Sequence, residues 1–117
     1  MALTFQIKTV DGVCVMGPEG RIVIGNEVGA LRDKIRELLS AGHTNFLVNL
    51  SGVSYMDSTG VGALVGSFTT IRGRGGQMKL SNLSQRTKDL LIMTKLLTVF
   101  DVFDNELDGI KSFATKG

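Results

Sequence analysis

The 117-residue sequence lacks the features that mark several protein classes. It contains one cysteine, one proline, one histidine and no tryptophan. Its single cysteine, Cys14, excludes an internal disulfide and a multi-cysteine metal site, and no metal site is predicted. No run of about 20 apolar residues is present, so the sequence predicts no membrane span. The formal net charge of +2 lacks the clustered basicity of nucleic-acid-binding proteins, so we expect no direct nucleic-acid contact.

Glycine, in contrast, is abundant, with 15 residues in the chain, whereas average usage is about 7%. Because there is a single proline, glycine must form most of the turns and helix ends. Hydrophobic residues make up 43% of the chain and charged residues 21%, as in ordinary globular proteins. The first twelve residues lack the basic start and apolar run of a signal peptide. We therefore predict a single cytoplasmic domain over residues 1–117.

The first 25 residues have the pattern of β-strands. Residues 3–9 alternate between apolar and polar side chains, which is the period of a half-buried strand. Asp11-Gly12 then separates two strand-like runs and predicts a hairpin, because both positions of such a turn need positive φ. Gly17-Pro18 is expected to end the second strand, and the apolar run Ile22–Ile24 is expected to form a third.

After residue 25 the pattern changes to helices that alternate with buried strands. Asn26 is the expected N-cap of a first helix, and Gly42 is its expected stop. This order predicts an α/β fold, a single-domain mixed β-sheet with an N-terminal antiparallel hairpin and then β/α units, flanked by about four helices. The predicted core face of the first helix consists of Val28, Leu31, Ile35, Leu38 and Leu39. The further predicted elements are a strand at Phe46–Leu50, a helix from about Thr59 to Arg72, a strand at Gln77–Ser81, a helix capped by Ser84 through Leu91, an unassigned apolar segment Leu96–Phe103, and a last helix from Asp104 or Asn105 with Leu107, Ile110 and Ala114 on one side.

The stretch Asp57-Ser58-Thr59-Gly60 lies between a predicted strand and a predicted helix. Ser and Thr are preferred N-cap residues, so Ser58 or Thr59 could simply cap the helix. Ser58 could instead be a phosphorylation site, because a helix N-terminus tolerates a phosphate. The phosphate would add about −1.5 to −2 charge at pH 7 beside Asp57 and would repel an acidic or apolar partner. On the residues alone, both interpretations stay open.

Enzymatic and nucleotide-binding alternatives fit this stretch poorly. Met56 stands where a nucleophile elbow needs its first glycine, and the single histidine, His43, lies in a predicted turn. Gly60, Gly62 and Gly66 have the wrong spacing for a dinucleotide-binding fingerprint. We therefore expect no enzymatic activity and no cofactor. Gly62 and Gly66 are interpreted as small residues that let their helix approach a sheet or a partner closely.

Three loops that follow predicted strands should meet at one end of the sheet, where ligands and partners bind in α/β folds. They are Gly25-Asn26, Met56–Gly60 and Asn82–Ser84. Met56 could equally be an ordinary core residue or an adaptable apolar contact. The predicted partner-binding residues are Gly25, Asn26, Met56, Asp57, Thr59, Gly60, Asn82 and Ser84.

The segment Phe46–Gly62, FLVNLSGVSYMDSTGVG, resembles the signature of the STAS domain, especially in freestanding anti-sigma factor antagonists. The resemblance extends to GRIVIGN, to GGQMKLSNLS and to the Leu90–Phe103 segment with LLTVFDVF, and so covers most of the chain. It implies a mixed sheet flanked by helices, a phosphoacceptor at Ser58 and a preceding acid at Asp57.

The same resemblance implies a phosphorylation-switched protein-binding module. Unphosphorylated members bind an anti-sigma factor, often itself a serine kinase, and so free a sigma factor. Phosphorylation releases the antagonist, and a PP2C-type phosphatase restores it. Two positions depart from the family pattern, since Asn49 stands where an acid is common and Thr59 where many members have a second serine. Thr59 is therefore a second candidate phosphoacceptor.

The alternative function is that of a scaffold or sensory-complex STAS subunit that regulates another signalling protein. A simple antagonist should be a monomer or weak homodimer, whereas a scaffold subunit should form a large particle. A small-ligand-binding protein and a hydrolase are the remaining alternatives.

Overall fold

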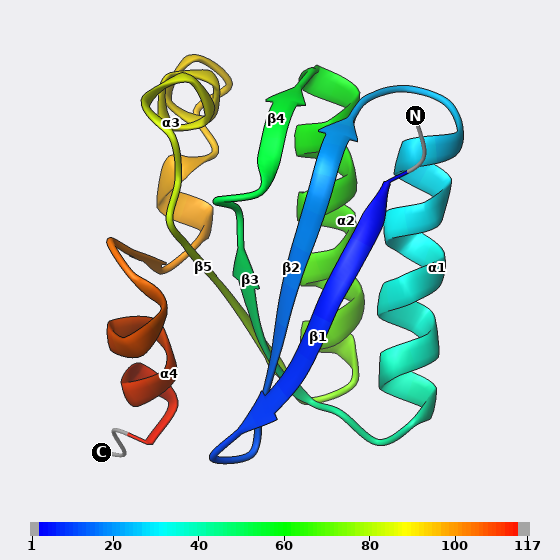
Figure 1. Cartoon of the computed structure of the whole chain (residues 1–117), viewed down its shortest axis with the longest axis vertical. Helices are drawn as coiled ribbons and strands as arrows, with labels where there is room; N and C mark the ends of the chain where they lie inside the picture. Colours follow the sequence, from blue (N-terminus) through cyan, green and yellow to red (C-terminus); the bar gives the residue numbers. More distant parts are fainter. Residues whose placement is uncertain (1–2, 115–117) are drawn as a thin grey trace.

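The structure, a computed structural model that describes residues 3–114, begins with the predicted hairpin (Figure 1). Strand β1 (Thr4–Val10) pairs antiparallel with β2 (Val13–Ile22). The turn residues Asp11 and Gly12 have φ values of 51° and 79°. Both are positive, as the Asp-Gly pair predicted.

Strand β2 is longer than the sequence predicted, and here the prediction of two separate strands was wrong. It continues through Gly17-Pro18 to Ile22, so no third strand forms at Ile22–Ile24. Residues 14–16 of β2 pair with β3 (Asn45–Asn49), and residues 20–22 pair with β4 (Val53–Met56). Pro18 lies between these two sets of paired residues, so its missing backbone N–H removes no hydrogen bond to β3 or to β4.

The six-stranded sheet has the order β1-β2-β3-β5-β6, with β4 beside β2. All pairs after the hairpin are parallel, which confirms the predicted mixed sheet. Strand β5 (Gln77–Ser81) has the predicted bounds. The unassigned segment forms a 3₁₀ turn, η1 (Leu97–Val99), followed by the short edge strand β6 (Val102–Phe103). Strand β4 was not predicted.

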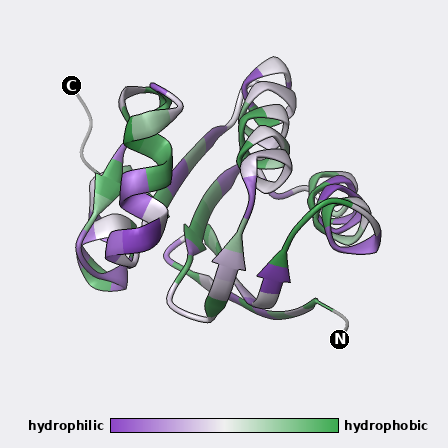
Figure 2. Ribbon diagram, turned by 90° about the horizontal axis from the view of Figure 1, so that it is seen from above, coloured by the Kyte–Doolittle hydropathy of each residue, from purple (hydrophilic) through white to green (hydrophobic). Residues whose placement is uncertain are grey.

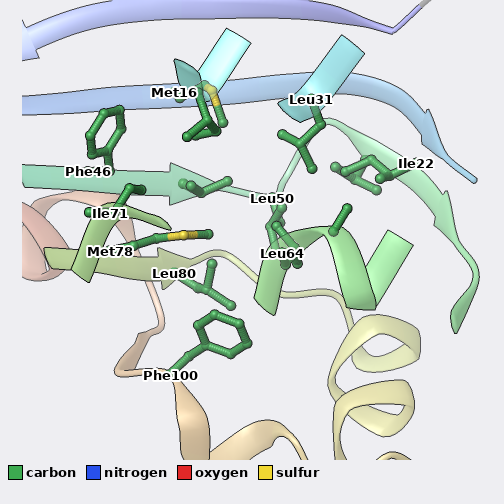
Figure 3. Close-up of a cluster of buried hydrophobic side chains, with 14 of the residues drawn as sticks. Met16, Ile22, Leu31, Phe46, Leu50, Leu64, Ile71, Met78, Leu80 and Phe100 are labelled. Atoms are coloured by element: carbon green, nitrogen blue, oxygen red, sulfur yellow. The ribbon is translucent and has the colours of Figure 1, made fainter. Parts of the chain in front are cut away.

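Helices α1 (Asn26–Ser40) and α2 (Ser58–Gly73) pack beside each other on one face of the sheet (Figure 1). The buried side chains of α1 are the five that the helical spacing predicted. They join Met16 and Phe46 from the strands and Leu64 from α2 in the main hydrophobic core (Figure 3). Burial of this shared apolar surface holds both helices to the sheet.

The other face of the sheet is covered in part by α4 (Glu106–Ala114). Ile110 and Phe113 of α4 form a second cluster with Leu47 and neighbouring valines of β2. The predicted inner face was therefore partly wrong, because Leu107 and Ala114 are exposed and Phe113 is buried. Seen from above, α1 and the C-terminal helix lie at opposite sides of the strands (Figure 2).

Helix α3 (Gln85–Met93) follows β5 and lies at the same end of the molecule as the tip of β4 (Figure 1). Its N-cap is Ser84, as predicted. None of the helices within residues 3–114 is long and apolar enough to cross a bilayer.

Candidate functional site

Helix α2 begins directly after β4, and its first turn is capped by Asp57. The Asp57 carboxylate accepts a hydrogen bond from the Gly60 backbone N–H at 2.8 Å through Oδ1. Its second oxygen, Oδ2, accepts from the Ile24 backbone N–H at 3.1 Å. Asp57 thus closes the helix end and joins it to the loop before α1. The interpretation that Ser58 or Thr59 caps the helix was therefore wrong.

These contacts also fix the ionisation of Asp57. Partial burial of the carboxylate opposes its charge, but the backbone hydrogen bonds from Gly60, Ile24, Thr59 and Asp57 together outweigh this effect. They hold the pKa of Asp57 below its usual value, as expected for a carboxylate that accepts several backbone N–H groups. Asp57 is consequently ionised at neutral pH and places a fixed negative charge at the positive end of the helix.

Ser58 is the first residue of α2, and its side chain is exposed. Because Asp57 does the capping, the Ser58 hydroxyl has no hydrogen-bond partner among residues 3–114. Thr59 is only half-exposed. Of the two candidate phosphoacceptors, Ser58 is therefore the one more open to a partner protein.

Gly60 lies in the tightest contact of this site. A Cβ atom here would overlap the backbone carbonyl oxygen of Ile22 and would lie 2.7 Å from Cγ of Met56. Met56 is 4% exposed and belongs to the hydrophobic core. The start of α2 is thus pressed against the ends of β2 and β4, which fixes the position of Ser58.

Gly62 and Gly66 have the opposite surroundings. Both are exposed, and no atom lies within 4 Å of a Cβ added at either position. The prediction that they let the helix approach a sheet or a partner closely is wrong for the sheet, since Gly60 has that role, and close approach of a partner stays a prediction.

The loop before α1 supplies Gly25 and Asn26. Gly25 is the N-cap, with φ of 112°, a conformation that L side chains rarely adopt. Asn26 is the first helical residue rather than the predicted N-cap, and both residues are exposed. The hydrogen bond between Ile24 N–H and Asp57 holds this loop against the start of α2.

The third predicted loop, after β5, lies at the same end of the sheet (Figure 1). Asn82 has φ of 59°, and its backbone N–H donates to the Phe103 carbonyl oxygen at 3.1 Å. Ser84 Oγ accepts from the Thr87 backbone N–H at 3.1 Å. Within residues 3–114 no hydrogen bond links this loop to the other two, so it borders the Asp57 loop without being fastened to it.

The departure at Asn49 has a structural explanation on the α4 side of the sheet. Asn49 Nδ2 donates to Glu106 Oε2 at 2.8 Å, and Lys8 Nζ lies 2.6 Å from Glu106 Oε1. Hydrogen bonds from Lys8 and Asn49 hold the pKa of Glu106 below its usual value. An acid at position 49 would face this carboxylate with a like charge instead of an amide donor.

The arrangement offers no support for nucleophilic catalysis at Ser58. The single histidine, His43, follows α1 and precedes β3, at the end of the sheet opposite to Ser58. Within residues 3–114 no group of three metal-ligating side chains is present either. What the site can do is present an exposed hydroxyl from a rigid, negatively charged helix start.

Sequence reasoning missed Tyr55 and Arg21, which lie beside this site. Tyr55 is on the unpredicted strand β4, and the Arg21 guanidinium lies 5.9 Å from the centre of its ring. The pairing of β4 with β2 brings them together, and a four-residue strand gives too short an alternation to be recognised.

Comparisons with known proteins agree with this geometry. The model of the STAS domain family matches residues 4–109. The anti-sigma-B factor antagonist of Bacillus subtilis is 38% identical over 81 residues, which cover 69% of this chain and 73% of that protein.

Two solved structures have the same fold. The crystal structure of an anti-sigma factor antagonist from Mycobacterium paratuberculosis superposes with a TM-score of 0.85, at 19% identity, and covers 97% of this chain and 95% of that one. The phosphorylated form of the Bacillus cell fate determinant SpoIIAA has a TM-score of 0.72 at 24% identity, and covers 94% of this chain and 99% of that one.

Proposed function

Because this chain belongs to the STAS domain family, we propose that it is an anti-sigma factor antagonist switched by phosphorylation of Ser58. The unphosphorylated chain binds an anti-sigma factor that is itself a serine kinase, and so releases a sigma factor. Phosphorylation of Ser58 by that kinase ends the binding, and a PP2C-type phosphatase restores it. The protein acts in the cytoplasm as a monomer or weak homodimer and has no catalytic activity of its own.

One observation carries this proposal: Ser58 is exposed and takes no part in the cap that holds α2. A phosphate on its hydroxyl adds about −1.5 to −2 charge at pH 7 without removing a hydrogen bond from the fold. The charge lies beside ionised Asp57 and is therefore felt by whatever approaches this end of the sheet. Such a modification changes binding while the fold stays intact.

The test is incubation of the chain with ATP and each anti-sigma factor kinase of the organism that encodes it, followed by mass-spectrometric mapping of the phosphate. We expect phosphate on Ser58, no modification of Ser58→Ala, and full modification of the matched control Thr59→Ala. Phosphate on Thr59 alone, or on neither residue, contradicts the proposal.

Binding of the same kinases is measured by calorimetry. Ser58→Asp should bind at least about tenfold more weakly than wild type, because it places a charge in the contact. Ser58→Ala should bind like wild type but should not be released by ATP. Both variants should unfold within about 0.5 kcal/mol of wild type, since the exposed side chain makes no contact that the fold needs.

A further inference from the structure

An apolar groove of about 440 Å³ lies between β4 and α3, next to the site described above. It is lined by Tyr55, Met56, Arg86, Asp89, Leu90 and Met93, and we call it the Tyr55 groove. Met56 is shared with the site, because Asp57 and Ser58 follow it directly in the chain. The groove therefore lies next to the start of α2, where Ser58 is exposed.

Two exposed apolar side chains line the Tyr55 groove. Met93 is 79% exposed and Tyr55 is 41% exposed. A single exposed apolar residue is ordinary, but two that line one groove at a candidate site indicate a protein-binding surface. Methionine also adapts its shape to a partner side chain more easily than a branched residue does.

One arginine, Arg86, lines the groove, and a second, Arg21, lies beside the Tyr55 ring. The guanidinium carbons of Arg21 and Arg86 each lie 5.9 Å from the centre of the Tyr55 ring. Neither arginine forms an ion pair with any carboxylate of residues 3–114. Asp89, the one acid of the groove, accepts a hydrogen bond from Gln85 Nε2 at 2.8 Å. Two guanidinium groups beside an aromatic ring are therefore available to a carboxylate from outside.

We propose that the Tyr55 groove docks an acidic and apolar segment of the anti-sigma factor. A carboxylate of that segment pairs with Arg86, which lines the groove, because guanidinium groups bind carboxylates in a bidentate manner, and Arg21 beside the Tyr55 ring adds positive charge nearby. An apolar neighbour packs against Leu90 and Met93. The proposal rests on the function proposed above and identifies the chemistry of the partner.

This docking also explains how the switch acts. An acidic segment in the Tyr55 groove must approach the start of α2, where Asp57 is already ionised. Phosphate on Ser58 adds further negative charge to the same surface, and like charges in an interface oppose association. The partner's acidity is what makes it sensitive to the modification.

The experiment measures the affinity of each variant for the anti-sigma factor kinase that binds wild type. Arg86→Glu, Arg21→Glu and Met93→Ser should each raise the dissociation constant about tenfold or more. The matched control is Arg36→Glu on α1, a helix that lies on the opposite side of the molecule from α3 (Figure 1), and the Arg36 side chain is 71% exposed. It carries the same change of charge and should stay within about twofold of wild type. Thermal unfolding of the free variants checks that each is folded.

The outcomes separate the two proposals. Wild-type affinity of all three groove variants, with Ser58→Asp still weakened, overturns the groove and leaves the proposed function standing. Failure of wild type to bind any anti-sigma factor overturns both. If Arg36→Glu weakens binding as much as the groove variants do, the groove is not the site of an acidic partner segment. The same conclusion follows if sedimentation experiments show that the groove variants change only the self-association of this chain. Loss of affinity confined to the groove variants, with a weaker dependence on salt, supports it.

Discussion

Gly60 and Gly62 lie two residues apart in the first turns of α2, and we predict that replacing each with alanine has opposite effects. In Gly60→Ala the new methyl group overlaps the Ile22 carbonyl oxygen and lies 2.7 Å from Met56 Cγ. Inserting a methyl into a packed site costs about 1–3 kcal/mol. Because the first overlap is with backbone, which cannot turn away as a side chain does, we expect about 3 kcal/mol.

In Gly62→Ala the new methyl group meets no atom within 4 Å. Alanine is better than glycine in a helix by about 0.8–1.0 kcal/mol, so this variant should be stabilised by up to that amount. The two variants should therefore differ by about 3–4 kcal/mol, the sum of the overpacking cost and the helix-propensity gain.

Urea unfolding at neutral pH, followed by far-UV circular dichroism, measures both free energies with the wild type as reference. A difference of about 3 kcal/mol corresponds to a shift of at least about 10 °C in the melting temperature for a domain of this size. If Gly60→Ala were as stable as Gly62→Ala, the start of α2 would not be pressed against β2, and the rigid placement of Ser58 would be refuted.

Three further predictions concern charge and packing. Asp57→Asn should lower the unfolding free energy at pH 7 by about 1 kcal/mol, because an amide has one acceptor oxygen where the carboxylate has two. Folding lowers the pKa of Asp57 below its ordinary value of 3.8, so its stabilisation is present above that value and is lost as the pH falls through the lower pKa of the folded state. The unfolding free energies of the two proteins should therefore converge at acid pH. Asn49→Asp should cost about 1–2 kcal/mol at pH 7, through the loss of a donor to Glu106 and the new like charge, with recovery as the pH falls and one of the two facing carboxyl groups is protonated. Phe113→Ala should cost about 3 kcal/mol in urea unfolding, whereas Leu107→Ala should stay within about 0.5 kcal/mol, because only Phe113 is buried.

Local patterns in the sequence correctly predicted the elements whose structure depends on residues close by in the chain. The Asp11-Gly12 hairpin depends on two backbone torsions, and the inner face of α1 depends on a helical period that runs over four turns. The continuation of β2 through Pro18 could not be predicted in this way. It depends on β2 changing its partner from β3 to β4, which is a property of the assembled sheet.

The candidate site shows the same limit at the level of single side chains. The sequence singled out Asp57 to Gly60, which form the start of α2, because three N-cap residue types precede a glycine. It could not tell which of them caps the helix, since Asp, Ser and Thr all have a suitable oxygen. The choice is made by the Ile24 N–H, which binds the second oxygen of a carboxylate. A hydroxyl offers one oxygen in place of two, so it would have to accept both hydrogen bonds at the same atom.

This choice of cap is what allows a charge switch at the next residue. If the Ser58 hydroxyl capped α2, a phosphate there would break the cap, and the modification would act on stability as well as on binding. With Asp57 as the cap, the dipole at the start of α2 favours a phosphate on Ser58, while the neighbouring carboxylate opposes it. These two effects are of opposite sign inside the protein and largely offset each other. A partner that brings its own acidic side chains to this surface meets the negative charge of both groups, so binding changes far more than folding does.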